Sequence, residues 1–208
     1  ILFSIGEFRD RPLAQDISNP FGKIIKINKI NKKYEILSLG HRNVQGLAFD
    51  SDVKFILSSE HGPKGGDEIN IQKDFNITNF GWPISSYGLH YDGTEKEYAP
   101  LFKSHSDHGF KEPFKYYVPS IGISEIEIIS SNFFNENISN DDKNIFVTSL
   151  ANRSIRYIKA DKNYNKILKE DLIFMGERIR DILYDKDNNL VYLIQETIPT
   201  FSILKKID

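Results

Sequence analysis

The sequence predicts an all-β fold of the β-propeller type, and three observations lead to this prediction. Short apolar runs rich in Ile, Phe, Tyr and Val are separated by clusters of Gly, Asn, Asp and Lys along the 208 residues. A pair of such runs recurs about four times, at a spacing of roughly 45 to 55 residues that is typical of propeller blades. No segment has a sustained helical repeat with capping residues at its ends.

The repeating unit is a pair of neighbouring strands, and further runs extend most pairs toward a four-stranded blade. The predicted pairs are 1–7 with 22–27, 55–61 with 67–72, 144–150 with 154–160, and 190–196 with 200–206. Runs at 46–50, 124–130 and 179–185 precede three of these pairs, and runs at 34–39 and 166–174 follow two. We therefore expect about four blades in a single partial domain that covers residues 1–208.

A long insertion, from about residue 74 to residue 115, interrupts this repeat. It contains the only Trp of the chain, Trp82, within the turn-forming segment Asn79-Phe80-Gly81-Trp82-Pro83. A loop of this length inside a compact domain is usually functional or disordered. Its aromatic content favours an ordered lid or wall.

The composition excludes several classes of protein. Lys plus Arg total 27 and Asp plus Glu total 29, so the net charge of -2 provides no global basic field for nucleic acid. Cys is absent, which excludes disulfides, thiolate nucleophiles and zinc–thiolate sites. No apolar run approaches the roughly 20 residues of a membrane helix, so no membrane span is expected. An anionic ligand would therefore need a local arginine site.

Such an arginine site is predicted in the segment Glu177-Arg178-Ile179-Arg180-Asp181. Arg178 and Arg180 are two residues apart on a predicted strand, so their side chains point to the same face. Two guanidinium groups on one face suit a ligand with carboxylates or phosphates. The alternative is a solvated strand face on which Asp181 or Glu177 pairs with the arginines.

A second candidate site is the turn that contains Gly62-Pro63 and Gly65-Gly66. Its glycines leave main-chain carbonyl oxygens accessible, and Asp67 and Glu68 add further oxygen donors, a combination that suits calcium. The alternative is an ordinary β-turn. The neighbouring His61 could be a base, a hydrogen-bond donor or a structural residue, and no second His stands at zinc-ligand spacing.

Five motifs in this order resemble the soluble quinoprotein glucose/sorbosone dehydrogenase family, which includes the aldose sugar dehydrogenases. They are Gly40-His41-Arg42-Asn43-x-Gln45-Gly46-Leu47-Ala48-Phe49, Ser59-Glu60-His61-Gly62-Pro63-x-Gly65-Gly66-Asp67-Glu68-Ile69-Asn70, Asn79-Phe80-Gly81-Trp82-Pro83, Pro119-Ser120 and Arg178-Ile179-Arg180-Asp181. The resemblance implies a six-bladed propeller that binds pyrroloquinoline quinone (PQQ) and calcium at its axial mouth. It also implies that the enzyme oxidises the anomeric carbon of aldoses to lactones.

The resemblance also implies a role for each matching residue. Arg42 and Asn43 would face the quinone oxygens, where the Arg42 cation stabilises the negative charge that develops during hydride transfer. The carbonyls of Gly62 and Pro63 would hold calcium. The resemblance further implies that Arg178 and Arg180 pair with the carboxylates of PQQ. Ser120 would contact the cofactor, and His61 and Asp67 would line the site.

Three departures from the family pattern qualify this expectation. The chain begins inside a predicted strand and without Met, so we expect that it continues upstream of Ile1. The resemblance implies that the family's catalytic His lies in this upstream part. Residues 1–208 alone are therefore expected to be inactive. Val118 replaces an aromatic wall of the sugar pocket, and Ala151 replaces a cofactor-contacting Lys whose charge Arg153 could supply. The sugar preference therefore stays open.

The expected protein is thus a PQQ-dependent aldose dehydrogenase with a small-molecule sugar substrate and an unidentified electron acceptor. A periplasmic or secreted location follows from the resemblance, and a homodimer is left open. One alternative is a non-catalytic propeller that binds protein or another ligand, although the retained arginines argue against it. Another is a calcium-dependent lactonase, which would need clustered Asp, Asn and Glu side chains on the metal.

Overall fold

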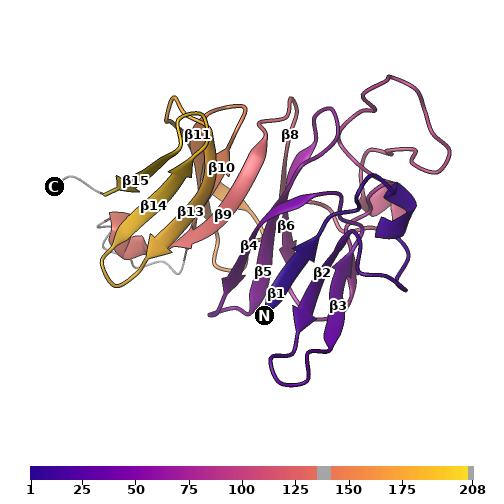
Figure 1. The fold of residues 1–208 in the computed structure, drawn as a ribbon, viewed down its shortest axis with the longest axis horizontal. Helices are drawn as coiled ribbons and strands as arrows, with labels where there is room; N and C mark the ends of the chain where they lie inside the picture. The colour runs from indigo at the N-terminus through magenta and orange to yellow at the C-terminus, as the bar shows by residue number, and fades with distance from the viewer. Residues whose placement is uncertain (135–141, 206–208) are drawn as a thin grey trace.

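The computed structural model describes residues 1–134 and 142–205 and places their strands in four sheets (Figure 1). The strands are β1 Leu2–Ile5, β2 Lys23–Ile27, β3 Tyr34–Leu39, β4 Val44–Asp50, β5 Phe55–Glu60, β6 Asp67–Gln72, β7 Thr78–Asn79, β8 Lys115–Tyr117, β9 Ile123–Ile129, β10 Lys143–Ser149, β11 Ser154–Ala160, β12 Ile167–Phe174, β13 Ile179–Asp185, β14 Leu190–Gln195 and β15 Thr200–Leu204. Three 3₁₀ helices complete the described elements: η1 Arg11–Ala14, η2 Ser106–His108 and η3 Ser131–Phe134. The predicted all-β fold is confirmed.

The sheets are successive blades of a β-propeller. Their strand orders are β1-β2-β3-β7, β4-β5-β6-β8, β9-β10-β11-β12 and β13-β14-β15. The first strands of neighbouring sheets contact one another, β1 with β4, β4 with β9, and β9 with β13. About four blades were expected, and every predicted run coincides with a strand. The last run was expected to reach Lys206, which lies outside the described residues.

Two strands near the ends of the insertion were not predicted. β7 is two residues long and pairs in parallel with β3 of the first blade. β8 pairs antiparallel with β6 and completes the second blade. Neither strand is long enough to have a visible alternation of apolar residues, which is why the sequence does not reveal them. The insertion thus touches two blades.

The core lies between adjacent blades, and β10 shows how the sequence builds it. Successive side chains of a strand point to opposite faces. Ile145 and Val147 pack into a cluster with Leu57 and Ile69 of the second blade. Phe146, on the opposite face, packs into a cluster with residues of the fourth blade. Because both faces are covered, the consecutive residues Ile145, Phe146 and Val147 are all apolar.

Candidate functional site

Arg42 lies between β3 and β4 and is held by three separate contacts. Its main-chain N–H donates to Glu60 Oε2 (2.8 Å), and its guanidinium Nη1 donates to the His61 carbonyl (3.1 Å). The guanidinium carbon lies 5.5 Å from the centre of the Trp82 ring, a cation–π distance. Arg42 is therefore fixed by the end of β5, by the residue that follows β5 and by the insertion.

Glu60 is the buried carboxylate behind this arginine. Its Oε1 accepts hydrogen bonds from His41 Nδ1 (3.0 Å) and Asn70 Nδ2 (2.8 Å), and His41 Nε2 contacts Ser38 Oγ at 2.7 Å. Burial opposes ionisation, but the charge and hydrogen bond of His41, together with main-chain donors, hold the pKa of Glu60 below its usual range. No role for Glu60 is predicted from the sequence, because its partners come from the turn between β3 and β4 and from β6.

The turn after β5 has no room for a side chain at Gly62. A Cβ there would lie 2.2 Å from the Gly66 carbonyl oxygen and 2.3 Å from that of Gly65. The Gly62 N–H donates to Asp67 Oδ1 (3.1 Å). Within residues 1–134 and 142–205, no hydrogen bond is donated to the carbonyl of Gly62 or of Pro63. These two oxygens have the donor chemistry that calcium prefers.

Asp67 connects this turn to Ser120. Its Oδ2 accepts from Ser120 Oγ (2.6 Å) and from the Ile123 N–H (2.9 Å), and its Oδ1 lies 3.9 Å from His61 Nδ1. Burial alone would raise the pKa of Asp67, but the nearby His61 imidazole and the hydrogen bonds from Ser120 and Ile123 outweigh it and lower the pKa. Gly62, His61, Asp67 and Ser120 are thus brought together.

Arg178 and Arg180 share one carboxylate. Arg178 Nε donates to Glu196 Oε2 and Arg180 Nη2 donates to Glu196 Oε1, each at 2.7 Å. The arginine side chains are 38% and 41% exposed. The partner is Glu196, just after β14, rather than Asp181 or Glu177. Sequence analysis missed Glu196 because the contact depends on the pairing of β13 with β14.

A chain of hydrogen bonds connects the two arginines to Asn43. Arg180 Nη1 donates to Gln45 Oε1 (3.4 Å), and Gln45 Nε2 donates to Asn43 Oδ1 (3.1 Å). These contacts cross from the fourth blade to the second. His61 joins the other predicted site residues. Its carbonyl accepts from Arg42, its N–H donates to the Asn43 carbonyl (3.1 Å), and its ring lies beside Asp67. Arg178 and Arg180 are connected to them through Gln45.

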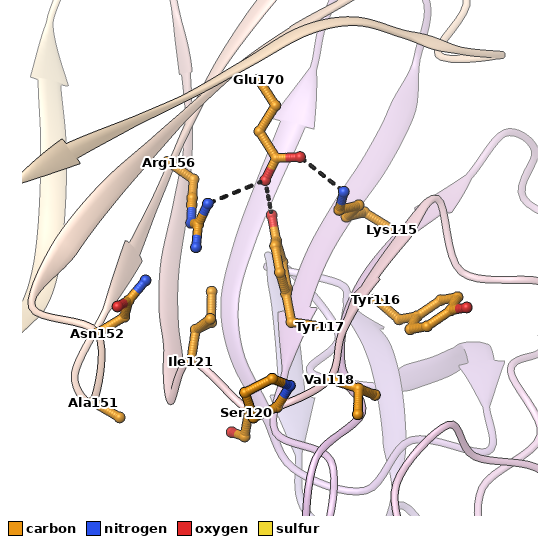
Figure 2. A pocket seen from close by; sticks show the side chains of 11 residues that line it. Lys115, Tyr116, Tyr117, Val118, Ser120, Ile121, Ala151, Asn152, Arg156 and Glu170 are labelled. Atoms are coloured by element: carbon orange, nitrogen blue, oxygen red, sulfur yellow. Dashed lines mark hydrogen bonds and ion pairs between the residues drawn. The ribbon is translucent and has the colours of Figure 1, made fainter.

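A cavity of about 530 Å³ lies beside Ser120 (Figure 2). It is also lined by Val118 and Ala151, which the resemblance indicates as departures from the family pattern. Arg153 does not line this cavity; its Nη1 donates to the Gly176 carbonyl at 3.5 Å.

The other acidic and histidine residues of these motifs have structural contacts. Glu68 is buried, and burial followed by the nearby charge of Glu60 raises its pKa well above the usual range. His105 Nδ1 contacts the Phe80 carbonyl at 2.9 Å, and His108 stacks on Phe102. In the part of the chain that the structure describes, no three Asp, Glu or His side chains are grouped as metal ligands. No helix among the described residues has the length and apolarity to cross a membrane.

Comparison with known proteins gives consistent matches. The family model described as Glucose / Sorbosone dehydrogenase matches residues 1–200. An uncharacterized protein of Synechocystis sp. is 32% identical over 220 residues, which cover 94% of this chain and 50% of that protein. Aldose sugar dehydrogenase YliI of Escherichia coli is 29% identical over 212 residues (95% and 54%), and quinoprotein glucose dehydrogenase B of Acinetobacter calcoaceticus is 24% identical over 260 residues (94% and 53%).

Solved structures give the same result. The crystal structure of a glucose dehydrogenase superposes with a TM-score of 0.79 and 26% identity, covering 100% of this chain and 60% of that one. The apo form of soluble aldose sugar dehydrogenase from Escherichia coli gives a TM-score of 0.78 and 25% identity, covering 99% and 60%. The chain spans about half the length of the curated relatives it matches. With nearly its whole length matched by the family model and five motifs in family order, the chain belongs to the glucose/sorbosone dehydrogenase family.

Proposed function

We propose that the full-length protein is a quinoprotein oxidoreductase that oxidises the anomeric carbon of aldoses to lactones by hydride transfer to PQQ, assisted by calcium. The observation that supports it most directly is the carboxylate of Glu196 between Arg178 and Arg180, with both contacts at 2.7 Å. This geometry suits a ligand that carries carboxylates. Both ion pairs are more than one third exposed and contribute little, so an incoming carboxylate can replace Glu196 at small cost.

Bound PQQ would supply the two-electron acceptor, and Arg42 would supply the fixed positive charge beside it. The main-chain contact to Glu60, the His61 carbonyl and the Trp82 ring hold Arg42 in place. A preorganised cation of this kind stabilises negative charge as it develops on an acceptor oxygen. Asn43 would add an amide donor on the same side.

Calcium would be held by the carbonyls of Gly62 and Pro63. Both oxygens receive no hydrogen bond from the described residues, and the turn admits no side chain at Gly62. Asp67 keeps the turn closed by accepting from the Gly62 N–H, and Ser120 fixes the orientation of Asp67. Calcium accepts several oxygen ligands, including main-chain carbonyls and water.

Proton removal from the sugar hydroxyl is assigned to a His outside this chain. Without it, residues 1–208 would turn over slower by a factor of about 100 to 10,000, the usual contribution of a general base. The electron acceptor, a periplasmic or secreted location and a homodimer are further parts of this proposal that rest on the family alone.

Reconstitution tests the proposal directly. The full-length protein, loaded with PQQ and calcium, is expected to reduce a redox dye with at least one aldose from a panel. The double variant Arg178→Ala with Arg180→Ala is expected to lose PQQ binding, measured by absorbance titration, while its circular dichroism stays unchanged. Lys26→Ala, an exposed cation paired with Glu35 on the first blade, is the matched control. Dye reduction with no aldose, or unchanged PQQ affinity in the double variant, would reject the proposal.

A further inference from the structure

The 530 Å³ cavity extends well beyond the residues that sequence analysis assigned to the site. It lies between β8 of the second blade and the outer strands β11 and β12 of the third (Figure 2). Ser120 and Val118 lie at one end, and Glu170 lies at the other. We call it the Glu170 cavity; its remaining lining residues are Lys115, Tyr116, Tyr117, Pro119, Ile121, Ala151, Asn152 and Arg156.

The carboxylate of Glu170 is already fully used by the cavity's own donors. It lies 2.8 Å from Lys115 Nζ and 3.7 Å from Arg156 Nη1, and it accepts from the Tyr117 hydroxyl at 3.1 Å. Burial, and then the charge of Glu170, raises the pKa of Tyr117, so its hydroxyl stays a donor. Two cations therefore share one carboxylate, and the cavity carries an excess positive charge.

Arg156 has a donor without an acceptor. Its Nε is buried and has no hydrogen-bond partner, although the side chain as a whole is 21% exposed. Its long distance to Glu170 and its position 5.5 Å from the Tyr117 ring leave the guanidinium only loosely paired. A buried charged donor without a partner is unfavourable. A negatively charged ligand that contacts Lys115 and the terminal nitrogens of Arg156 would neutralise the excess positive charge of the cavity.

The cavity adjoins the proposed sugar-oxidising site through Ser120. Its hydroxyl donates to Asp67, which closes the Gly62-Pro63 turn, and its side chain also lines the cavity together with Val118 and Ala151. Asn152, on the wall opposite Lys115, adds an amide that can bond sugar hydroxyls.

From these contacts we infer that the Glu170 cavity binds the carboxylate of an acidic sugar, with Arg156 and Lys115 as the residues that recognise it. The class of ligand is an aldose that carries a uronic acid group. This inference rests on the proposed function for the sugar, but the carboxylate contact can be measured without any oxidation.

A matched pair of glycosides tests the inference. Methyl β-glucuronide and methyl β-glucoside differ only in a carboxylate against a hydroxymethyl group, and their blocked anomeric carbons cannot be oxidised. Calorimetric titration of the full-length protein without PQQ is expected to give at least tenfold tighter binding of the glucuronide. Its affinity should fall as NaCl is raised, because salt screens a partly exposed ion pair.

Two single variants locate the contact. Arg156→Gln and Lys115→Gln are each expected to reduce glucuronide binding to the level of the glucoside. If Arg156→Gln fails to fold, Lys115→Gln still carries the test, since Lys115 is one third exposed. Lys26→Gln is the matched control, because Lys26 also lies 2.8 Å from a carboxylate but on the first blade; its glucuronide affinity should not change.

Several outcomes would overturn the inference. It is rejected if the two glycosides bind with equal affinity, or if glucuronide binding is unchanged in both variants. It is also rejected if inorganic phosphate binds as tightly as the glucuronide, because the cavity would then be a general anion site. Oxidation of glucose without glucuronide binding would reject this inference alone. Glucuronide binding that depends on Arg156, with no aldose oxidised, would reject the proposed function alone.

Discussion

Asp67 joins parts of the candidate site that are more than 50 residues apart in the sequence. One carboxylate oxygen accepts from Gly62 and the other from Ser120 and Ile123. Three donors on one buried carboxylate are enough to hold its pKa low despite the cost of burial. The residue therefore sets the shape of the turn that offers its carbonyls to calcium.

Replacing Asp67 by Asn should destabilise the full-length protein by about 1–3 kcal/mol, because the amide nitrogen would face a main-chain or hydroxyl donor. Because the pKa of Asp67 is lowered in the folded state, the Asp67 carboxylate contributes to the free energy of unfolding above about pH 4. This contribution is lost as the pH falls through the pKa of the folded state. Urea unfolding at pH 7 and at pH 3.5 measures both effects. A destabilisation that is the same at both pH values would contradict this account.

Glu127 on β9 behaves in the opposite way. Burial, and then the charge of Glu125, raises its pKa to about 7, so the protonated form is favoured in the fold. A raised pKa contributes stability below the unfolded-state value near 4.3, and this contribution is lost as the pH rises through about 7. Between pH 5 and pH 8, the wild type should lose about 1–2 kcal/mol relative to Glu127→Gln. The free energy of unfolding is measured against pH for the wild type and for Glu127→Gln. Parallel curves for these two proteins would refute this account; parallel curves are expected for the wild type and the exposed control Glu35→Gln.

Sequence analysis predicted the residues with distinctive chemistry but not the partners that orient them. Arg42, Asp67 and Arg178 were recognised from their motifs. Glu60 and Glu196 were not recognised, because each meets its arginine only when strands pair. Glu60 then accepts from the main-chain N–H of Arg42, and Glu196 accepts from the side chain of Arg178. Such contacts depend on register, which a single sequence does not state.

At the scale of elements, the predicted strand runs were accurate because each has apolar residues on at least one face. β10 is covered on both faces, and its three central residues, Ile145, Phe146 and Val147, are all apolar, as expected for a strand that is buried on both faces. β7 and β8 were missed because two or three residues cannot establish a period. What the sequence cannot supply is which edge of which sheet the insertion returns to.

A buried hydrogen bond connects the second and third blades. The hydroxyl of Tyr164, in the turn between β11 and β12, donates to Asp50 Oδ2 at the end of β4 (2.7 Å). Lys143 of β10 lies 3.0 Å from the same carboxylate. Asp50 therefore has two partners from the third blade, one on β10 and one in the turn between β11 and β12.

Tyr164→Phe should lower the free energy of unfolding by about 1–2 kcal/mol, since the aromatic ring stays packed while a buried hydrogen bond to a charged group is lost. Thermal unfolding of the full-length protein measures this change. Tyr34→Phe, an exposed residue of β3, is the control and should have little effect. If both variants unfold at the wild-type temperature, the Asp50 contact does not stabilise the blade interface.

At the scale of the whole molecule, the last described sheet has one covered face and one open face. Its open face carries, in register, Leu183 of β13, Tyr192 and Ile194 of β14, and Phe201 and Ile203 of β15. Leu183 is 60% exposed and Phe201 is 65% exposed. The opposite face packs on Phe146 of the third blade. Apolar side chains gathered on one face of a sheet favour association.

A polypeptide of residues 1–208 expressed alone should therefore self-associate. Light scattering after size exclusion should give a mass above 24.0 kDa. The double variant Leu183→Lys with Phe201→Lys should shift the mass toward the monomer, because two charges on the open face oppose its burial. The control is the double variant Ile30→Lys with Tyr34→Lys, two exposed positions on the first blade, which should leave the mass unchanged. A monomeric wild type would show that the open face is harmless.

The route of residues 74–115 restricts where this chain can change in length. The segment leaves β6, pairs with β3, places Trp82 against Arg42 and returns as β8 beside its starting strand. A residue added or removed on either fixed arm would shift the indole or the register of the returning strand. Residues 91–98 are mostly exposed, and a side chain at Gly93 would meet nothing within 4 Å. Length variants, affinity tags or spectroscopic labels should therefore be accepted at this tip and rejected beside Trp82 and in β8.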